Sequence, residues 1–118
     1  MIRRGNVHWV DLDPVQGSEA AKRRPAVVVS NDRANTTAER LGKGVVTVVP
    51  LTTNTTRVFA FQVLVEPDES GLPRESKAQA EQIRSVSVRR LDGAPVGKLS
   101  ARTLTALEEA IRVHLDLV

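Results

Sequence analysis

The sequence predicts a mainly β protein with one helix at its C-terminus, and three observations support this. Short runs rich in β-branched residues recur along most of the chain and are separated by polar segments with Gly, Pro and Asn. From Ser100 onward the apolar residues instead repeat at helical spacing. The length of 118 residues suits a single domain, residues 1–118. Strands followed by one covering helix indicate a small antiparallel barrel or sheet.

Four strands are predicted in the first half of the chain. Residues 5–12 alternate and are rich in β-formers, which is typical of a strand. Residues 25–30 contain an unbroken valine run, which is typical of a strand buried on both faces. The third and fourth strands are expected at residues 45–51 and 58–65.

The segments between and after these strands are less regular. Residues 31–44 are expected to be turn-like, with one helical turn over residues 37–41, and residues 67–74 are expected to form a loop. Residues 76–86 leave two alternatives open, because their Ala, Gln and Glu favour a helix while their small residues also fit one face of a strand. Residues 96–99 predict a short last strand.

The C-terminal helix is the clearest local prediction. Ser100 is a favourable N-cap. The apolar residues that follow form one stripe at helical spacing, Leu104, Leu107, Ile111, Leu115 and Val118. We expect this stripe to face the core.

Composition excludes several kinds of site. The chain has no cysteine, which excludes disulfides, thiolate metal sites and cysteine nucleophiles. His8 and His114 lack the spacing of metal ligands, so we expect no metal and no cofactor, and we interpret both histidines as structural. No segment approaches the ~20 apolar residues of a membrane span, and no leader precedes the first strand, so a cytoplasmic protein without membrane contact is expected.

The charge balance is basic and depends mainly on arginine. There are 17 Lys and Arg against 14 Asp and Glu, a net charge of +3. A guanidinium group grips phosphate through two parallel hydrogen bonds, so this composition permits a nucleic-acid partner. A GC-rich genome would produce the same arginine bias. Trp9, Phe59 and Phe61 are too few for an RNA platform of stacked rings.

Three polar clusters lie at the ends of predicted strands. Residues 17–25 (GSEAAKRRP) end in a basic pair, and because neighbouring strand residues point to opposite faces, only one of Arg23 and Arg24 should face a given groove. Residues 50–56 (PLTTNTT) carry hydroxyl groups, and residues 81–84 (EQIR) carry long polar side chains. Each cluster can contact phosphates or base edges, but taken alone a solvated loop, turn backbone and surface ion pairs are the favoured explanations of the three clusters.

These clusters, in this order, resemble the MazF/PemK family of bacterial toxin endoribonucleases, the mRNA interferases. The resemblance spans essentially the whole chain and includes the terminal helix. The matching segments are Arg4-Gly5-Asn6-Val7, Asp11-Leu12-Asp13-Pro14, Gly17-Ser18-Glu19, Arg24-Pro25-Ala26-Val27-Val28-Val29-Ser30-Asn31-Asp32, Pro50-Leu51-Thr52-Thr53, Phe61-Gln62-Val63, Glu81-Gln82-Ile83-Arg84 and Val96-Gly97-Lys98-Leu99.

The resemblance implies an SH3-like barrel of the CcdB/PemK/MazF type that forms a two-fold homodimer. It implies a toxin that a cognate acidic antitoxin holds inactive, and metal-independent, sequence-selective cleavage of single-stranded RNA, whether mRNA, tRNA or rRNA. In that reaction the 2′-hydroxyl attacks the adjacent phosphate and leaves a 2′,3′-cyclic phosphate and a 5′-hydroxyl.

The family's functional residues carry over by position. Arg24 and Thr52 take the catalytic positions, and the positions of substrate contacts fall on Glu19, Asn31, Thr53 and Gln82. An arginine side chain is already protonated at neutral pH, so Arg24 fits a phosphate clamp and a proton donor to the leaving 5′-oxygen better than a base. The acceptor of the 2′-hydroxyl proton is left open, with Glu19 as a candidate.

Two further alternatives accompany this hypothesis. A CcdB-like relative would poison DNA gyrase without enzymatic activity through its C-terminal residues, yet here Leu115–Val118 look like a continuation of the helix stripe. A basic RNA-binding module would bind in a salt-sensitive way without forming product. The segment Ala20-Ala21-Lys22 stands where many relatives carry Gly, which is expected to stiffen this loop.

Overall fold

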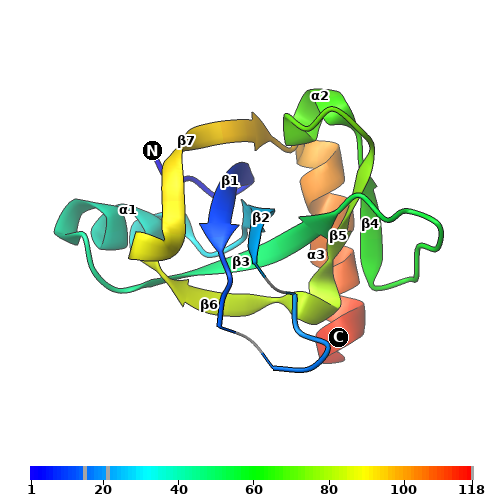
Figure 1. Ribbon diagram of the computed structural model, residues 1–118, viewed down its shortest axis with the longest axis horizontal. Coiled ribbons are helices and arrows are strands. Elements are labelled where there is room, and N and C mark those ends of the chain that lie inside the picture. Colours follow the sequence, from blue (N-terminus) through cyan, green and yellow to red (C-terminus); the bar gives the residue numbers. More distant parts are fainter. Residues whose placement is uncertain (15, 21, 118) are drawn as a thin grey trace.

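An antiparallel sheet with helices at both ends organises the chain (Figure 1). The computed structural model describes residues 1–14, 16–20 and 22–117. Its elements in chain order are β1 (Asn6–Asp11), β2 (Arg23–Val28), α1 (Asp32–Leu41), β3 (Val45–Thr52), β4 (Gln62–Val65), α2 (Pro67–Ser70), β5 (Ser76–Gln79), the 3-10 helix η1 (Ala80–Gln82), β6 (Arg84–Ser87), the 3-10 helix η2 (Val88–Arg90), β7 (Leu91–Lys98) and α3 (Ala101–Leu115).

The strands pair in the order β4-β5-β3-β2-β1-β7, and β6 also pairs with β3. Figure 1 shows α1 and α3 at opposite ends of this arrangement. The prediction of a mainly β fold with a C-terminal helix is confirmed. The sheet is not closed into a barrel, because in the described part of the chain the pairing order ends at β4 on one side and at β7 on the other.

The central strands are buried on both faces, as the valine run of β2 predicts. One core packs toward α1 and contains Val10, Ala26, Val28, Ala38, Val48 and Val86. The other packs toward α3 and contains Val7, Val27, Val49, Leu51, Leu72 and Leu107. Alternation along each strand sends successive side chains to these two cores. The register of β1, β2 and β3 is therefore held from both sides.

The prediction of one helical turn over residues 37–41 is wrong, because α1 is a complete helix of 10 residues. Asn31 caps it, with Oδ1 accepting a hydrogen bond of 2.8 Å from the Ala34 amide. Gly42 ends it in the left-handed conformation at φ 64°. Asn35 is fully buried and hydrogen-bonded to the preceding turn. These contacts outweigh the weak helix propensity of Asn and Thr.

Other segments differ from expectation in their bounds. β4 begins at Gln62 rather than at residue 58, and residues 67–70 form the short helix α2 within the predicted loop. Residues 76–86 contain two short strands separated by η1, so neither a continuous helix nor a continuous strand describes them. β7 is longer than the strand predicted at residues 96–99 and begins at Leu91.

The C-terminal helix is confirmed, but its apolar stripe is buried only in part. Ser100 accepts a hydrogen bond of 3.2 Å from the Thr103 amide and caps α3. Leu107 is fully buried, whereas Leu115 is 47% exposed and Leu117 is 55% exposed. The interpretation of the last residues as a core stripe is therefore wrong at Leu115, where the helix extends beyond the sheet it covers. Val118 lies outside the described residues.

No helix in the described ranges is both long and apolar enough to cross a membrane.

The close approach of α2 to β7 requires glycine at residue 71. A Cβ atom there would lie 1.8 Å from the Val96 carbonyl oxygen, and φ is +75°. Gly42 has a similar φ of +64° but open space around it. We expect Gly71→Ala to lower the free energy of unfolding by about 1–3 kcal/mol more than Gly42→Ala, since only Gly71→Ala adds a steric clash to the backbone strain. Urea unfolding of both variants measures this, and equal losses would contradict it.

His8 makes the stability depend on pH. Its side chain is fully buried in β1, and burial followed by the charge of the N-terminus lowers its pKa. Below the unfolded-state pKa of ~6.5, the unfolded chain binds a proton that the folded chain resists, so acid favours unfolding. We expect the free energy of unfolding to fall from about pH 7.5 to about pH 5.5, by at most ~1.4 kcal/mol per pH unit for one proton.

Urea unfolding across this range measures the effect, and the control is His8→Asn, which should lack this slope. Asp32 and Glu39 have a lowered pKa in the folded chain, so they also stabilise it. This stabilisation is lost only at more acidic pH, where the two carboxylates become protonated. An unchanged slope in His8→Asn would assign the pH dependence to other groups.

Candidate active site

A cavity of about 470 Å³ opens where β2 begins and β3 ends. Its lining combines apolar and polar groups. The apolar members are Trp9, Pro25, Leu51, Leu72 and Pro73, and the polar members are Lys22, Arg23, Arg24, Thr52 and Thr53. The cavity thus contains three of the six residues that the sequence singles out, Arg24, Thr52 and Thr53.

Arg24 and Thr52 meet at this cavity. β2 and β3 pair from Val28 opposite Val48 to Ala26 opposite Pro50. Arg24 lies two residues beyond the last pair on β2, and Thr52 lies two residues beyond it on β3. Both residues line the cavity, so a guanidinium group and a hydroxyl group belong to one site.

Arg23 belongs to the wall of the same cavity. Its guanidinium carbon lies 4.7 Å from the centroid of the Trp9 ring, and its Nε donates a 2.8 Å hydrogen bond to Oδ2 of Asp92. The prediction that only one of the two arginines faces a given groove is wrong here, since Arg23 and Arg24 both line the cavity. The cavity lies at the end of the strands, where residues of both faces reach it.

Gln82 and Glu19 do not line the cavity. Glu19 lies on the loop between β1 and β2, and Gln82 of η1 holds this loop in place. The Gln82 side chain donates a 3.1 Å hydrogen bond to the Ser18 carbonyl and accepts a 2.8 Å bond from the Ala20 amide. Oε1 of the exposed Glu19 accepts a 2.6 Å bond from the Gln16 amide. Gln82 therefore ties this loop to η1.

Lys22 holds the base of the same loop. Its amide donates to Oδ1 of Asp13 at 2.8 Å, and its carbonyl accepts from the Leu12 amide at 2.8 Å. Its φ is 67°, in the left-handed region that glycine adopts more readily. The stiffening expected from Ala20-Ala21-Lys22 stays a prediction, and Ala21 lies outside the described residues.

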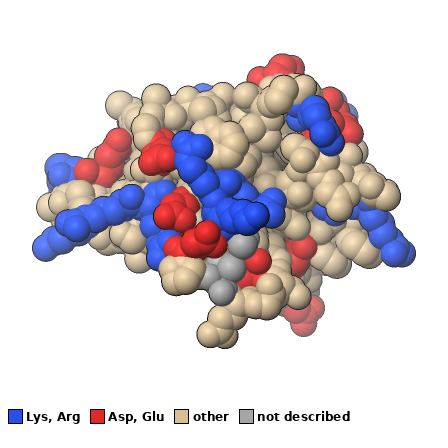
Figure 2. Space-filling view, in the orientation of Figure 1, with Lys and Arg blue, Asp and Glu red and all other residues tan. Residues whose placement is uncertain are grey.

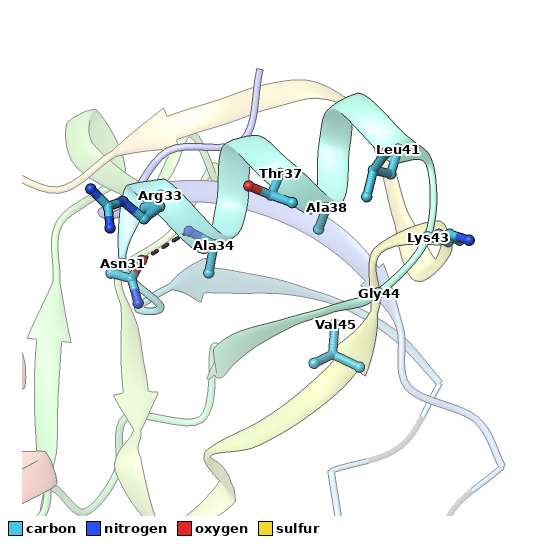
Figure 3. Close-up of a pocket in the computed structure, with 9 residues that line it drawn as sticks. All are labelled: Asn31, Arg33, Ala34, Thr37, Ala38, Leu41, Lys43, Gly44 and Val45. Atoms are coloured by element: carbon cyan, nitrogen blue, oxygen red, sulfur yellow. Dashed lines mark hydrogen bonds between the residues drawn. The ribbon is translucent and has the colours of Figure 1, made fainter.

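Asn31 lies away from Arg24 and Thr52 within this chain. It caps α1 and borders a groove of about 660 Å³ between α1 and the start of β3 (Figure 3). Leu41 and Val45 give this groove apolar walls, and Arg33 and Lys43 lie at its margin. The structure therefore does not bring Asn31 together with the other predicted site residues in one chain.

Two neighbouring clefts extend the cavity. One shares Thr53 with it and continues along residues 54–56 to Arg74. The other shares Lys22 and Arg23 and also contains Arg89, Arg90, Asp11, Asp13 and Asp92. Figure 2 shows basic side chains gathered in the middle of this face with acidic side chains among them. A polyanion crossing this face would meet cations on both sides of the Arg24 position.

The histidines lie elsewhere. His8 is buried in β1, and neither ring nitrogen has a hydrogen-bond partner within the described part of the chain. His114 is on α3, with its ring 6.4 Å from that of Phe61. The described residues contain no group of three or more His, Cys, Asp or Glu arranged to hold a metal ion.

Trp9, Leu72 and Pro73 line the cavity, although the sequence pattern does not single them out as site residues. Trp9 reaches the cavity because β1 pairs with β2 and sets it opposite Pro25. Leu72 and Pro73 come from the segment after α2 and reach the cavity through tertiary packing. No local pattern indicated them.

The chain is similar to known proteins over nearly its full length. Residues 3–115 match the family described as PemK-like, MazF-like toxin of type II toxin–antitoxin system. The chain is 58% identical over 117 residues to endoribonuclease MazF9 of Mycobacterium tuberculosis, covering 99% of this chain and 98% of that protein. It is 33% identical over 109 residues to the endoribonuclease toxin MazF of Escherichia coli K12, covering 92% and 89%. The solved structure of M. tuberculosis toxin MazF-mt6 matches with a TM-score of 0.76 and 29% identity, covering 96% of this chain and 98% of that one.

The anchoring role of Gln82 can be measured at one amide. We expect Gln82→Ala to raise the hydrogen-exchange rate of the Ala20 amide by about fivefold, since a net hydrogen bond is worth about 1 kcal/mol. The control is Gln79→Ala in the neighbouring strand β5. NMR-detected exchange measures both variants, and an unchanged rate at Ala20 would contradict the anchoring role.

Proposed function

The chain belongs to the PemK-like, MazF-like toxins of type II toxin–antitoxin systems, and we propose that it cleaves single-stranded RNA in the cavity between β2 and β3. Its relatives at 58% and 33% identity are named endoribonucleases, and this chain is an endoribonuclease of the same family. The single observation that supports this location is that Arg24 and Thr52 line the same cavity.

The proposed reaction needs no metal ion and no water in its first step. The 2′-hydroxyl oxygen of the RNA forms a bond to the adjacent phosphorus, and the bond from phosphorus to the 5′-oxygen breaks. The 2′-proton leaves to a base, and the 5′-oxygen receives a proton. The products are a 2′,3′-cyclic phosphate and a 5′-hydroxyl.

Arg24 and Thr52 would stabilise the negative charge that builds on the phosphate oxygens. The guanidinium offers two parallel hydrogen bonds to a phosphate. Oγ1 of Thr52 accepts a 3.3 Å hydrogen bond from the Asn54 amide, which leaves the hydroxyl proton for a phosphate oxygen. A preorganised donor of this kind is worth ~10²–10³ in rate.

Proton transfer divides between two groups in this proposal. Arg24 enters the step protonated, so it acts as phosphate clamp and gives a proton to the leaving 5′-oxygen, and it regains a proton from solvent afterwards. Glu19 is the candidate acceptor of the 2′-hydroxyl proton. Its Oε1 accepts from the Gln16 amide, and Glu19 does not line the cavity, so this role requires the loop tip to move toward the phosphate when RNA binds.

The substrate contacts fall into three groups. Thr53 lines the cavity and would touch the RNA directly. Gln82 and Glu19 would act through the β1–β2 loop that they shape. Asn31 borders the groove beside α1, so in a two-fold homodimer it would reach the RNA held by the other protomer. Sequence selectivity would depend on these contacts rather than on the net charge of +3.

The partners in this proposal are single-stranded RNA, whether mRNA, tRNA or rRNA, and a cognate antitoxin. An acidic, partly disordered antitoxin segment would be complementary to the cations beside the cavity. The proposed site of action is the cytoplasm, where the RNA substrates are.

The first test is cleavage of a long RNA by the purified protein in the presence of EDTA. We expect discrete fragments that end in a 2′,3′-cyclic phosphate. Arg24→Ala and Thr52→Val should each lower the rate by about 10²–10³, because each removes one donor to the reacting phosphate. The control is Arg102→Ala, which removes an exposed arginine on α3. Mapping the 5′ ends of the fragments identifies the cleavage sequence.

Three outcomes would contradict the proposal. Unchanged cleavage by Arg24→Ala would show that the reaction does not take place at the assigned site. Salt-sensitive RNA binding without product would favour the binding-module alternative. Gyrase-dependent DNA breaks that persist in Arg24→Ala would favour the CcdB-like alternative.

A further inference from the structure

A lysine is buried directly beside Thr52. Lys77 lies on β5, where it pairs with Thr52 of β3, and its residue is only 8% exposed. Lysine is rarely buried unless its ammonium group has a partner. Because opposed residues share a face, Lys77 lies beside Thr52, which lines the cavity together with Arg24.

The ammonium group of Lys77 binds the segment that follows Thr52. Its Nζ donates a 2.6 Å hydrogen bond to the carbonyl oxygen of Arg57. A charged donor makes such a bond roughly twice as strong as a neutral one. The chain leaves β3 after Thr52, makes a polar turn, and is fastened at its far end to the strand beside Thr52.

Two hydrogen bonds inside this turn connect its ends. The Asn54 amide donates to Oγ1 of Thr52 at 3.3 Å, and the Thr56 amide donates to Oδ1 of Asn54 at 3.3 Å. The contact of Lys77 with Arg57 follows directly after Thr56. The orientation of the Thr52 hydroxyl is thus linked, bond by bond, to Lys77.

We propose that Lys77 is a positioning residue for RNA cleavage, which fastens the turn after β3 and thereby aims the Thr52 hydroxyl at the reacting phosphate. This inference rests on the proposed function. Without the tether, the exposed turn would sample several conformations, and the Asn54 amide would no longer hold Oγ1 of Thr52 in one orientation. Small displacements of a catalytic group from its productive geometry cost up to ~10² in rate.

The test compares Lys77→Met with the wild type on a short RNA that contains the mapped cleavage site. Methionine retains an apolar stem but cannot donate to Arg57. We expect kcat to fall by about 10- to 100-fold while KM changes by less than about threefold, because the tether orients a catalytic group and does not hold the substrate. The control is Lys98→Met, an exposed lysine on β7 that lies outside both the cavity and the α1 groove, which should leave kcat unchanged.

A readout independent of activity accompanies the kinetics. In Lys77→Met we expect faster hydrogen exchange at the Asn54 and Thr56 amides, the two donors within the turn. A folded Lys77→Met with wild-type kcat would overturn the inference. A lowered kcat with unchanged exchange at both amides would overturn it as well, since the turn would then not depend on Lys77. If the wild type cleaves no RNA, the proposed function fails, whereas the exchange rates still test the tether.

A second variant covers the case in which Lys77→Met does not fold. Asn54 is exposed, and Asn54→Ala removes only the acceptor of the Thr56 amide. We expect this variant to lower kcat in the same direction. Where both single variants fold, combining them should cost little beyond Lys77→Met alone, because both act on one chain of hydrogen bonds. Additive losses, or an unaffected Asn54→Ala, would contradict the proposed linkage.

Discussion

The pairing of β2 with β3 is the constraint on which the rest of the molecule depends. Val27 and Val49 face one core, and their neighbours Val28 and Val48 face the other. A slip by one residue would exchange the side chains of the two faces, and both faces are packed. The register therefore cannot shift, and it fixes the strand ends from which Arg24 and Thr52 line one cavity. Hydrophobic packing in the middle of the strands thus determines the geometry of the polar groups at their ends.

Around this rigid pair, the polar groups of the site are held by hydrogen bonds to loops. Gln82 fastens the loop between β1 and β2, and Lys77 fastens the turn after β3. Both loops border the cavity end of the strands, so a partner that binds there would contact segments held by few bonds. Cations and carboxylates alternate on the adjoining face, which makes the electrostatic attraction for a polyanion modest. Recognition must then depend on local contacts and on how these loops are held.

The element order was largely predictable because burial leaves a strong pattern in this sequence. The valine runs predict β2 and β3 directly, and the Ser100 N-cap followed by apolar residues at helical spacing predicts α3. α1 was missed because its stability comes from the Asn31 cap, from Gly42 and from the buried Asn35, which local propensity does not include. The pattern of residues 76–86 is ambiguous because this segment contains two short strands separated by η1. Both strands pair with β3, which is distant in sequence, so no local pattern indicates them. Leu115 fits the helical repeat but extends beyond the sheet.

Residue types and their order were sufficient to place the chain near a family, to exclude cysteine chemistry and to single out Arg24 and Thr52. Those properties are local, and they can be read residue by residue. The three-dimensional fold was needed to show that Gln82 supports a loop, that Asn31 lies at another groove and that Trp9, Leu72 and Pro73 wall the cavity. It was also needed to find Lys77 beside Thr52. Such contacts join residues that are distant in sequence, and they exist only because packing on both faces of the sheet holds the strands in one register.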